Sequence, residues 1–359
     1  MSKDEKYMRR ALQLASKGQG STSPNPLVGC VIVHDNKVIG EGFHLKAGEA
    51  HAEVNAINSV RNKDLLRQST LYVSLEPCSH HGRTPPCSNL IVDNGIPRVV
   101  LACSDPNPLV AGRGIKKLRD SGVKVLEGIC KMEAEYLNRR FFTVVIKARP
   151  YIILKWAETP NGFIDSARKD KDSPQWLTNE WARTLVHKQR AEEDAIMLGS
   201  NTILMDNPSL TVREWSGSHP TRVLIDRNNR FLPDAKVFDN NGARVIYFQA
   251  KADTGLPKHI STEQIVSSDD AEMFILQILV SHGINSVIIE GGAKFLSSFI
   301  KKGLWDEAFC YIGEIEFDAG TKAPLLTKHR RISSCRVGLT KLNHYVNIDN
   351  VYGRGTTCR

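Results

Sequence analysis

The residues best suited to chemistry lie between positions 51 and 87: His51, Glu53, Cys78 and Cys87. One imidazole and two thiolates form the ligand set of a catalytic zinc site, which keeps its fourth position open for water. Zinc in such a site lowers the pKa of water to about 7 and so supplies a nucleophile at neutral pH. A carboxylate two residues from the histidine is placed to carry protons rather than to bind metal. We therefore predict His51, Cys78 and Cys87 as zinc ligands and Glu53 as the catalytic general acid and base.

Each of these residues alone has an ordinary structural explanation, because a lone histidine often ends a helix and a lone cysteine often fills a core. Together, H-x-E followed by P-C and a second cysteine is the signature of zinc-dependent deaminases. Residues 71–75 predict a strand that leads into Pro77-Cys78, and residues 51–60 predict a helix that begins with His51 and Glu53. The sequence therefore predicts hydrolytic release of ammonia from an amidine-like ring carbon.

Eight residues separate the two cysteines, whereas nucleic-acid deaminases usually have two. This insertion contains His80, His81 and Arg83, which suits a substrate with an anionic group. The stretch Glu76-Pro-Cys-Ser-His-His-Gly-Arg-Thr-Pro-Pro-Cys87 resembles the signature of the bifunctional deaminase/reductase family of riboflavin biosynthesis. The similarity extends to residues 23–29 and 105–114, which resemble further segments of the same family.

The bulk properties allow two domains in one chain. A chain of 359 residues is long enough for two separate cores, and 41% hydrophobic with 24% charged residues is ordinary for a globular protein. We find no run of eighteen apolar residues and no apolar signal peptide at the N-terminus, so we expect a cytoplasmic protein without a membrane partner. Eight cysteines in a chain of this length do not indicate a disulfide framework.

The net charge of +9 could indicate a nucleic-acid partner. However, the excess of lysine and arginine is scattered, and no basic stripe alternates with aromatic residues. A phosphorylated small molecule explains the charge as well as a polymer would. We therefore predict no nucleic-acid partner.

The order of expected elements indicates the fold class. Strands and helices alternate along both halves, which predicts layered α/β domains. A helix over residues 131–142 is expected to close the first domain, and a strand begins directly after Arg149-Pro150. We predict domains over 1–146 and 150–359, which the resemblance implies to be a zinc-dependent deaminase and an NADPH-dependent reductase. The resemblance implies a cytidine-deaminase-like α/β/α sandwich followed by a dihydrofolate-reductase-like domain.

Loops of the first domain offer candidate substrate contacts. Asn25 lies between two prolines that fix its backbone, and the resemblance implies that its amide contacts the pyrimidine. His44 follows a predicted strand and is either a substrate contact or a solvated loop residue. Arg83 flanks the predicted zinc ligands and is a candidate for anion contact.

The second half contains no zinc ligand set and no strand–Gly-x-Gly-x-x-Gly–helix unit. Glu290-Gly291-Gly292 follows an apolar strand and precedes a predicted helix, so it is either a phosphate cradle or an ordinary turn. The segments 155–162 and 190–213, with Glu290-Gly-Gly, resemble the reductase domain of the same family. This resemblance implies NADPH as the cofactor, in addition to Zn²⁺ in the first domain.

The resemblance also implies which residues bind each molecule in the second domain. The residues expected to contact the substrate are Arg190, Leu210, Arg213 and Glu290. Those expected to contact NADPH are Trp176, Thr202, Asp206, Gly291, Gly292, Ala293, Lys294, Phe295 and Leu296. The arginines could instead be surface residues, and Trp176 could be part of a core.

The function implied is the deamination of 2,5-diamino-6-(5-phosphoribosylamino)pyrimidin-4(3H)-one, followed by NADPH reduction of its ribosyl group. The product would be 5-amino-6-(5-phosphoribitylamino)uracil. One alternative is a single-activity deaminase whose second domain is a degenerate scaffold, and another is a nucleic-acid deaminase. We expect a homodimer or a higher homo-oligomer.

Overall fold

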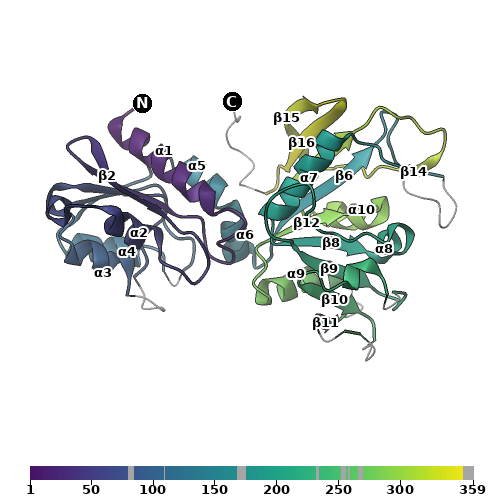
Figure 1. Ribbon diagram of the computed structural model, residues 1–359, viewed down its shortest axis with the longest axis horizontal. Coiled ribbons are helices and arrows are strands. Elements are labelled where there is room, and N and C mark those ends of the chain that lie inside the picture. The colour runs from purple at the N-terminus through teal and green to yellow at the C-terminus, as the bar shows by residue number, and fades with distance from the viewer. Residues whose placement is uncertain are drawn as a thin grey trace. The chain divides into compact units, whose positions relative to one another are not determined.

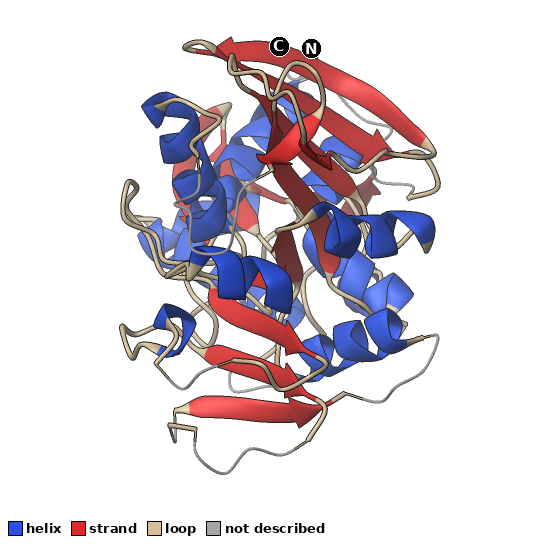
Figure 2. Cartoon of the chain, turned by 90° about the vertical axis from the view of Figure 1, so that its right-hand side faces the viewer, coloured by secondary structure: helices blue, strands red, loops and turns tan. Residues whose placement is uncertain are grey.

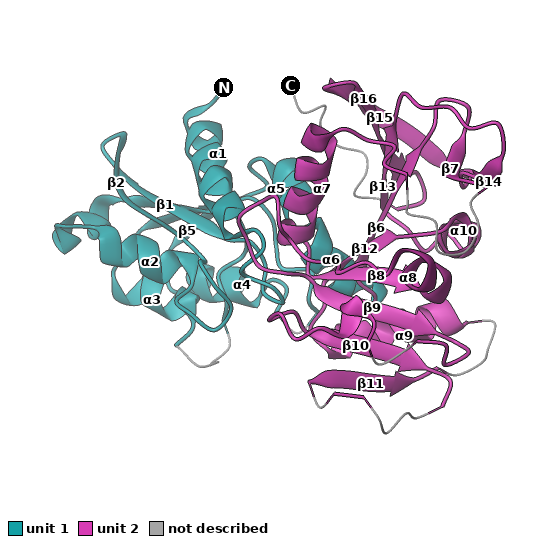
Figure 3. Ribbon diagram, turned by 45° about the vertical axis from the view of Figure 1, so that its right-hand side comes forward, with its two compact units in different colours: residues 1–148 teal, residues 149–359 magenta. Residues whose placement is uncertain are grey.

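The computed structural model describes residues 1–79, 85–108, 110–167, 175–231, 234–251, 256–257, 259–265 and 270–350. The chain forms two compact units, Met1–Ala148 and Arg149–Arg359 (Figures 1 and 3). Each unit has its own sheet and its own buried clusters of apolar side chains. The predicted fold class, two α/β domains in succession, is confirmed.

Unit 1 is built on a five-stranded sheet in the order β2-β1-β3-β4-β5. Strand β1 pairs antiparallel with both β2 and β3, whereas β3, β4 and β5 run parallel to one another. The strands are β1 (Gly29–His34), β2 (Lys37–Phe43), β3 (Thr70–Val73), β4 (Arg98–Leu101) and β5 (Lys124–Glu127).

Helices cover both faces of this sheet, as the α/β/α prediction required. Helices α1 and α5 lie on one face, and α2, α3 and α4 lie on the other (Figure 3). The helices are α1 (Lys3–Ala15), α2 (Ala52–Ser59), α3 (Cys87–Asp93), α4 (Arg113–Asp120), α5 (Lys131–Leu137) and α6 (Arg139–Lys147). Short 3-10 turns occupy Ser16–Gly18 and Lys63–Gln68.

The central strands β1, β3 and β4 are buried on both faces, so their side chains alternate between two apolar layers. On the face that carries the active-site helices, Cys30 and Ile32 pack with Ala56 of α2. On the other face, the ring of Tyr72 lies 5.2 Å from that of Tyr7 in α1. This packing holds α2 and α1 in place against the two faces of the sheet.

The single helix predicted over residues 131–142 is wrong, because α5 ends at Leu137 and α6 begins at Arg139. The buried side chain of Asn138 lies at the break. Its amide accepts from the N–H of Leu27 at 2.8 Å and donates to the Leu27 carbonyl at 2.9 Å. This pair of long-range hydrogen bonds ties Asn138 to Leu27, and its backbone, with φ of −94° and ψ of 15°, departs there from helical geometry.

Unit 2 is built on a nine-stranded sheet in the order β11-β10-β9-β8-β12-β6-β13-β16-β15. Its strands run parallel from β11 to β13, and only β16 and β15 pair antiparallel. Figure 2 shows the progressive rotation of these strands from one edge to the other, the twist expected of a large sheet. The strands are β6 (Tyr151–Glu158), β8 (Ala195–Gly199), β9 (Thr221–Asp226), β10 (Val245–Gln249), β11 (Ile260–Gln264), β12 (Ser286–Glu290), β13 (Glu307–Ile312), β15 (His329–Val337) and β16 (Thr340–Asn347).

The remaining elements of unit 2 are four helices, one 3-10 turn and a two-stranded ribbon in the described part of the chain. The helices are α7 (Glu180–Glu192), α8 (Ser200–Asp206), α9 (Ala271–Ser281) and α10 (Ala293–Lys301). The ribbon pairs β7 (Phe163–Ser166) with β14 (Gly320–Lys322), and the 3-10 turn is Lys236–Phe238. None of these helices, nor any other in the described residues, is both long and apolar enough to span a bilayer.

Candidate active sites

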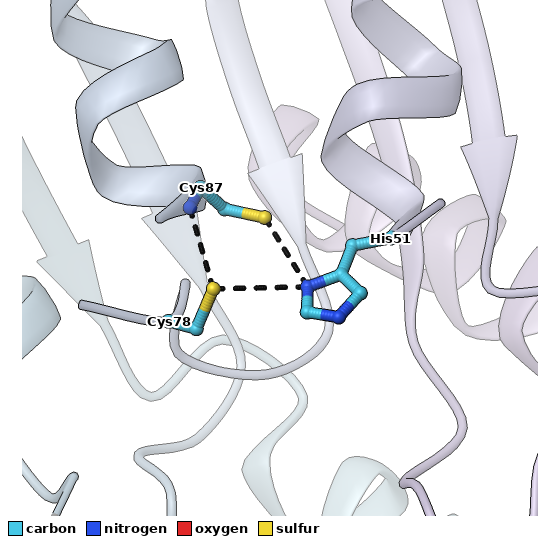
Figure 4. Close-up of side chains that lie close together, drawn as sticks. All are labelled: His51, Cys78 and Cys87. Carbon is cyan, nitrogen blue, oxygen red and sulfur yellow. Dashed lines mark hydrogen bonds between the residues drawn. The ribbon is translucent and has the colours of Figure 1, made fainter. Parts of the chain in front are cut away.

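The predicted zinc ligands come together in unit 1 (Figure 4). His51 is the N-cap of α2, Cys78 lies in the loop after β3, and Cys87 is the first residue of α3. The Nδ1 atom of His51 lies 3.7 Å from Sγ of Cys78 and 3.4 Å from Sγ of Cys87. All three donor atoms lie within 4.8 Å of one another, although the sequence separates the outer two by thirty-five residues.

This donor set fits zinc. Tetrahedral zinc with ordinary bonds to sulfur and nitrogen requires N···S separations of about 3.6 Å, close to the two separations found here. Two thiolates with one imidazole favour zinc over hard cations such as Mg²⁺, which prefer oxygen ligands. The trio supplies three ligands, the number expected of a catalytic site with one open position.

The contact between the two thiols shifts their pKa values in opposite directions. Cys87 donates to the sulfur of Cys78, and this contact lowers the pKa of Cys78 to about 4. The same contact raises the pKa of Cys87, and it is the largest of several effects with that sign. The backbone N–H of Cys87 also donates to Sγ of Cys78 at 3.3 Å, which stabilises the thiolate. A thiol must lose its proton before it can bind a metal ion, and Cys78 does so readily here.

Glu53 lies in the first turn of α2, buried to 3% exposure beside the zinc ligands. Burial raises the pKa of Glu53 to about 7, with a further contribution from the charge of Cys78. A carboxyl group with a pKa near neutrality can both take and return a proton at the pH of the cell. This is the property that the predicted general acid and base requires.

Asn25 and His44 meet beside the ligands. Nδ1 of His44 lies 3.2 Å from the carbonyl oxygen of Ala50, and Nε2 lies 3.1 Å from Nδ2 of Asn25. Because a carbonyl can only accept, Nδ1 carries the proton and Nε2 accepts from the Asn25 amide. Burial lowers the pKa of His44, in agreement with this neutral form. Its ring also lies edge-on to that of His51, with centroids 5.6 Å apart.

Arg83, the third candidate substrate contact of this domain, lies outside the described residues, as do His80 and His81. Its predicted contact with an anion stays a prediction.

The second site lies on one face of the sheet of unit 2. Side chains alternate along its strands, so Ile153 and Ile288 share one face in a small cluster, while Ile152 and Ile289 belong to the large core on the other face. Lys155 and Glu290 lie two residues further along β6 and β12 than Ile153 and Ile288, so they are on the same face. They are direct neighbours in the register of the two strands. At the carboxyl end of β12, Lys155 and Glu290 thus lie side by side next to α7.

Glu290 is the centre of a buried charged cluster. Arg190 of α7 donates to both of its oxygens, at 3.1 and 2.8 Å, and Nζ of Lys155 lies 3.8 Å from Oε2. Burial alone would raise the pKa of Glu290, but Arg190 and Lys155 outweigh it and lower the pKa to about 2. Glu290 and Arg190 were predicted from the sequence, and the structure shows that they bind each other.

Lys155 was not among the predicted site residues. Burial lowers its pKa, partly opposed by the charge of Glu290, and its ammonium group lies 5.6 Å from the centroid of the Tyr311 ring. The hydroxyl of Tyr311 donates to Gln189 of α7 at 3.1 Å. A lysine within the otherwise apolar run 151–156 was the signal that could have identified this residue.

The low pKa of Glu290 predicts a stability effect in acid. Because the folded-state pKa is below the ordinary value of 4.5, the stabilisation is complete above that value and is lost as the pH falls toward 2. We expect unit 2 to lose about 2 kcal/mol from this group between pH 5 and pH 3. Glu290→Gln should be less stable near neutral pH, because it leaves buried cations without their partner, and the difference from the wild type should shrink as the pH falls, because the variant lacks this part of the pH dependence.

Denaturant unfolding followed by tryptophan fluorescence measures this effect in unit 2, because all five tryptophans lie in residues 149–359. Equal losses of unfolding free energy in the wild type and the variant between pH 5 and 3 would contradict the assignment.

The other predicted substrate residues lie near the same helix. The backbone N–H of Arg213 donates to Nδ1 of His187 in α7 at 3.2 Å, and its exposed guanidinium bonds to Ser209 and to Thr211. Arg190 reaches the carbonyl of Thr211 at 3.4 Å, which connects the two arginines. The side chain of Leu210 is buried in a core cluster, so only its backbone, with φ of 52°, is available for a ligand.

The turn after Glu290, predicted as a phosphate cradle or an ordinary turn, joins β12 to α10. Gly291 has φ of 133°, a conformation that favours glycine, and Gly292 is the N-cap of α10. The N–H of Gly292 donates to the hydroxyl of Thr202 in α8 at 3.0 Å. Thr202 and the glycines, predicted as cofactor contacts on separate segments, therefore form one structure.

The remaining predicted cofactor contacts differ in their side-chain positions. Leu296 is buried in the large core and Phe295 packs against that core, whereas Ala293 is half-buried and Lys294 is exposed. Asp206 ends α8, one turn after Thr202. Trp176 is 64% exposed with the guanidinium of Arg183 5.0 Å from its ring centroid, so it is a surface residue rather than a core residue.

Comparison with known proteins agrees with this division of the chain. The model of the RibD C-terminal domain, a reductase domain that uses NADPH, matches residues 150–346. The model of the cytidine and deoxycytidylate deaminase zinc-binding region matches residues 1–103. These two matches cover both of the sites described above.

Relatives match over nearly the whole chain. The riboflavin biosynthesis protein RibD of Aquifex aeolicus is 40% identical over 312 residues, 86% of each chain. RibD of Escherichia coli is 38% identical over 326 residues, 86% of this chain and 87% of its own. These matches span the deaminase and the reductase together.

Solved structures agree. The diaminohydroxyphosphoribosylaminopyrimidine deaminase/5-amino-6-(5-phosphoribosylamino)uracil reductase of Thermotoga maritima superposes with a TM-score of 0.86 at 38% identity, covering 96% of this chain and 99% of its own. Acinetobacter baumannii RibD gives a TM-score of 0.88 at 33% identity, covering 96% and 98%. The chain therefore belongs to the RibD family of bifunctional riboflavin biosynthesis enzymes, which join a zinc-binding deaminase domain to a reductase domain.

Proposed function

We propose that the two sites act in succession on one phosphorylated pyrimidine. Unit 1 removes the 2-amino group of 2,5-diamino-6-(5-phosphoribosylamino)pyrimidin-4(3H)-one, and unit 2 reduces the ribosyl group to give 5-amino-6-(5-phosphoribitylamino)uracil. The observation that carries the first step is the trio His51, Cys78 and Cys87 beside a buried carboxylate with a raised pKa. The ribose phosphate stays on the pyrimidine through both reactions, so one product is the next substrate.

In the deamination, His51, Cys78 and Cys87 would hold zinc, which when bound acidifies a water molecule for attack on the ring carbon. Glu53 takes the proton of the water and passes it to the amino group, which leaves as ammonia. Asn25, oriented by its hydrogen bond to neutral His44, presents an amide to the polar edge of the pyrimidine. The step balances, because the oxygen of water becomes the ring carbonyl, one of its protons leaves with ammonia, the other ends on the ring nitrogen, and Glu53 returns to its starting state.

We expect one zinc ion per chain, bound in unit 1, because the three donor atoms have the separations that zinc requires. Elemental analysis of purified protein measures the content. The double variant Cys78→Ser, Cys87→Ser should lose both the metal and deamination. A double variant of Cys103 and Cys310, which lie elsewhere in the two units, is the matched control and should keep zinc. Full zinc content in the Cys78, Cys87 variant would refute the site.

In the reduction, NADPH supplies a hydride when bound, and the backbone N–H groups at the start of α10, which lack partners within the helix, would hold a phosphate of the cofactor beside Thr202. Lys155 lies at the same edge of the sheet and would donate a hydrogen bond or proton to the oxygen that opens the sugar ring. Glu290 holds Lys155 in place and can accept from a sugar hydroxyl, while Arg190 fixes the orientation of Glu290. These groups position the sugar C1 for hydride transfer.

Arg213→Ala should impair reduction mainly through substrate binding, because its exposed guanidinium lies beside the site and can pair with the ribose phosphate. Loss of a charge-assisted contact typically costs about 1.5–3 kcal/mol, so KM should rise by about one to two orders of magnitude. Arg244→Ala removes the same charge at the amino end of β10, the opposite edge of the sheet, and should leave KM unchanged. An unchanged KM in Arg213→Ala would assign this arginine to the surface.

We also propose that the partner is this small molecule and not a nucleic acid. The eight residues between Cys78 and Cys87 and the scattered positive charge both favour a small anionic substrate. A phosphorylated substrate and NADPH are molecules of the cytoplasm, where we place the protein. We propose a homodimer or a higher homo-oligomer as its assembly.

A further inference from the structure

Glu76 is a buried carboxylate to which neither reaction assigns a role. It follows β3 and stands two residues before Cys78, and it is only 5% exposed. Its backbone N–H donates to the carbonyl of Cys103 at 3.0 Å, so its position at the end of the strand is fixed. A buried carboxylate is unfavourable unless its oxygens accept hydrogen bonds, and the partners of Glu76 are therefore informative.

Four backbone N–H groups donate to this carboxylate. Oε1 accepts from Gly114 at 2.9 Å and from Ile115 at 3.3 Å. Oε2 accepts from Gly112 at 3.0 Å and from Asp105 at 3.2 Å. The donors at 112, 114 and 115 belong to the start of α4, whose N–H groups have no partner within the helix. One side chain thus caps α4 and holds the beginning of the loop that leads to it.

A second contact joins the same two segments independently of Glu76. A Cβ atom built on Gly114 would lie 2.1 Å from the carbonyl oxygen of Pro77. No side chain fits there, so α4 packs backbone to backbone against the residue directly before Cys78. On the other side, the carbonyl of Cys78 accepts from the N–H of Ser88 in α3 at 3.1 Å. The ligand loop is held between the starts of α3 and α4.

We infer that Glu76 is a positioning residue of the deaminase, which fixes the loop of Cys78 against α4 and so sets the affinity and geometry of the metal site. Only Pro77, with its fixed φ, separates Glu76 from Cys78, so a displacement of one is transmitted to the other. Groups that orient metal ligands typically account for about 10–100-fold in metal affinity. The inference rests on the zinc site proposed above.

Glu76→Gln tests this with little change in shape. The amide keeps one accepting oxygen but turns an N–H₂ group toward two N–H donors, so two of the four hydrogen bonds are lost. Gly114→Ala tests the same contact from the other side, because its methyl group must displace Pro77. Alanine is a better helix former than glycine, so an effect limited to α4 would stabilise the protein. Glu127→Gln is the matched control, since the side chain of this exposed glutamate of β5 forms a surface ion pair with Arg119 and lies away from the ligand loop.

The experiment uses the full chain and measures zinc affinity by competition with a chelator. It also records the absorption spectrum of the Co²⁺-substituted protein, which responds to the geometry of the thiolate ligands. We expect zinc to bind about 10–100-fold more weakly in Glu76→Gln and Gly114→Ala, with altered cobalt bands. Glu127→Gln should match the wild type, and reduction of the deaminated substrate should be unchanged in all three variants.

Wild-type zinc affinity and cobalt bands in Glu76→Gln, even with a lower melting temperature, would overturn the inference and leave Glu76 with a purely structural role. If Glu76→Gln fails to fold, Gly114→Ala decides, and wild-type affinity in that variant has the same consequence. Failure of the wild type itself to bind zinc would instead refute the proposed deaminase site.

Discussion

Glu53→Gln is expected to abolish most deamination while leaving zinc binding and reduction intact. Glu53 lies beside the ligands but is not one of them, and glutamine preserves its size while removing its ability to carry protons. General acid–base catalysis contributes about 10²–10⁴-fold to a rate. Because the same carboxyl group serves both the attack of water and the departure of ammonia, we expect a loss toward the upper end of that range.

The second unit provides the internal control for this variant. Its core, its charged cluster and its glycine turn are all formed within residues 149–359. Given the already deaminated pyrimidine and NADPH, Glu53→Gln should therefore reduce it at close to the wild-type rate. Zinc content and the melting curve establish that the variant is folded. A parallel fall of deamination and reduction in a folded, zinc-loaded variant would contradict two separate sites.

The deaminase site could be predicted from the sequence because most of its chemistry is encoded locally. His51 and Glu53 are joined by the first turn of one helix, and Cys78 and Cys87 are on either side of a short loop, so spacing alone constrains their geometry. The role of Glu76 could not be predicted, since its four partners lie 29 to 39 residues away and are backbone groups. Almost any residue type can provide a backbone N–H, so the sequence does not reveal which residues donate to Glu76.

The break at Asn138 has the same explanation. Residues 131–142 have a helical pattern, and the residue at the break is held by two hydrogen bonds to Leu27, 111 residues away. Local propensity cannot report a partner at that distance.

The reductase site was less predictable because it depends on the register of a parallel sheet. Lys155 and Glu290 are neighbours only because β6 and β12 pair in the observed register. Resemblance to the family identified positions, but not which atoms are available at them. Leu210 and Leu296 are the clearest cases, since both side chains are buried in core clusters and only their backbone groups can face a ligand.

Lys155→Met should produce the largest loss of reduction among single variants of unit 2. Methionine has nearly the length of lysine and suits an apolar environment, so the space beside Tyr311 stays filled. Glu290 keeps its two hydrogen bonds from Arg190, and no buried carboxylate is left unpaired. The fold should therefore survive while the only group proposed to protonate the sugar oxygen is lost.

A preorganised donor of this kind typically contributes about 10²–10³-fold to kcat, and we expect a fall of that size in the reduction of the deaminated pyrimidine. Lys302→Met is the matched control, because Lys302 forms an ion pair with Glu272 at the opposite end of α10 from the glycine turn. It should reduce the substrate at the wild-type rate, and both variants should deaminate normally. Tryptophan fluorescence, which reports on unit 2 alone, establishes whether Lys155→Met is folded. A folded Lys155→Met protein with wild-type kcat would leave the lysine as a partner of Glu290 without a part in the reaction.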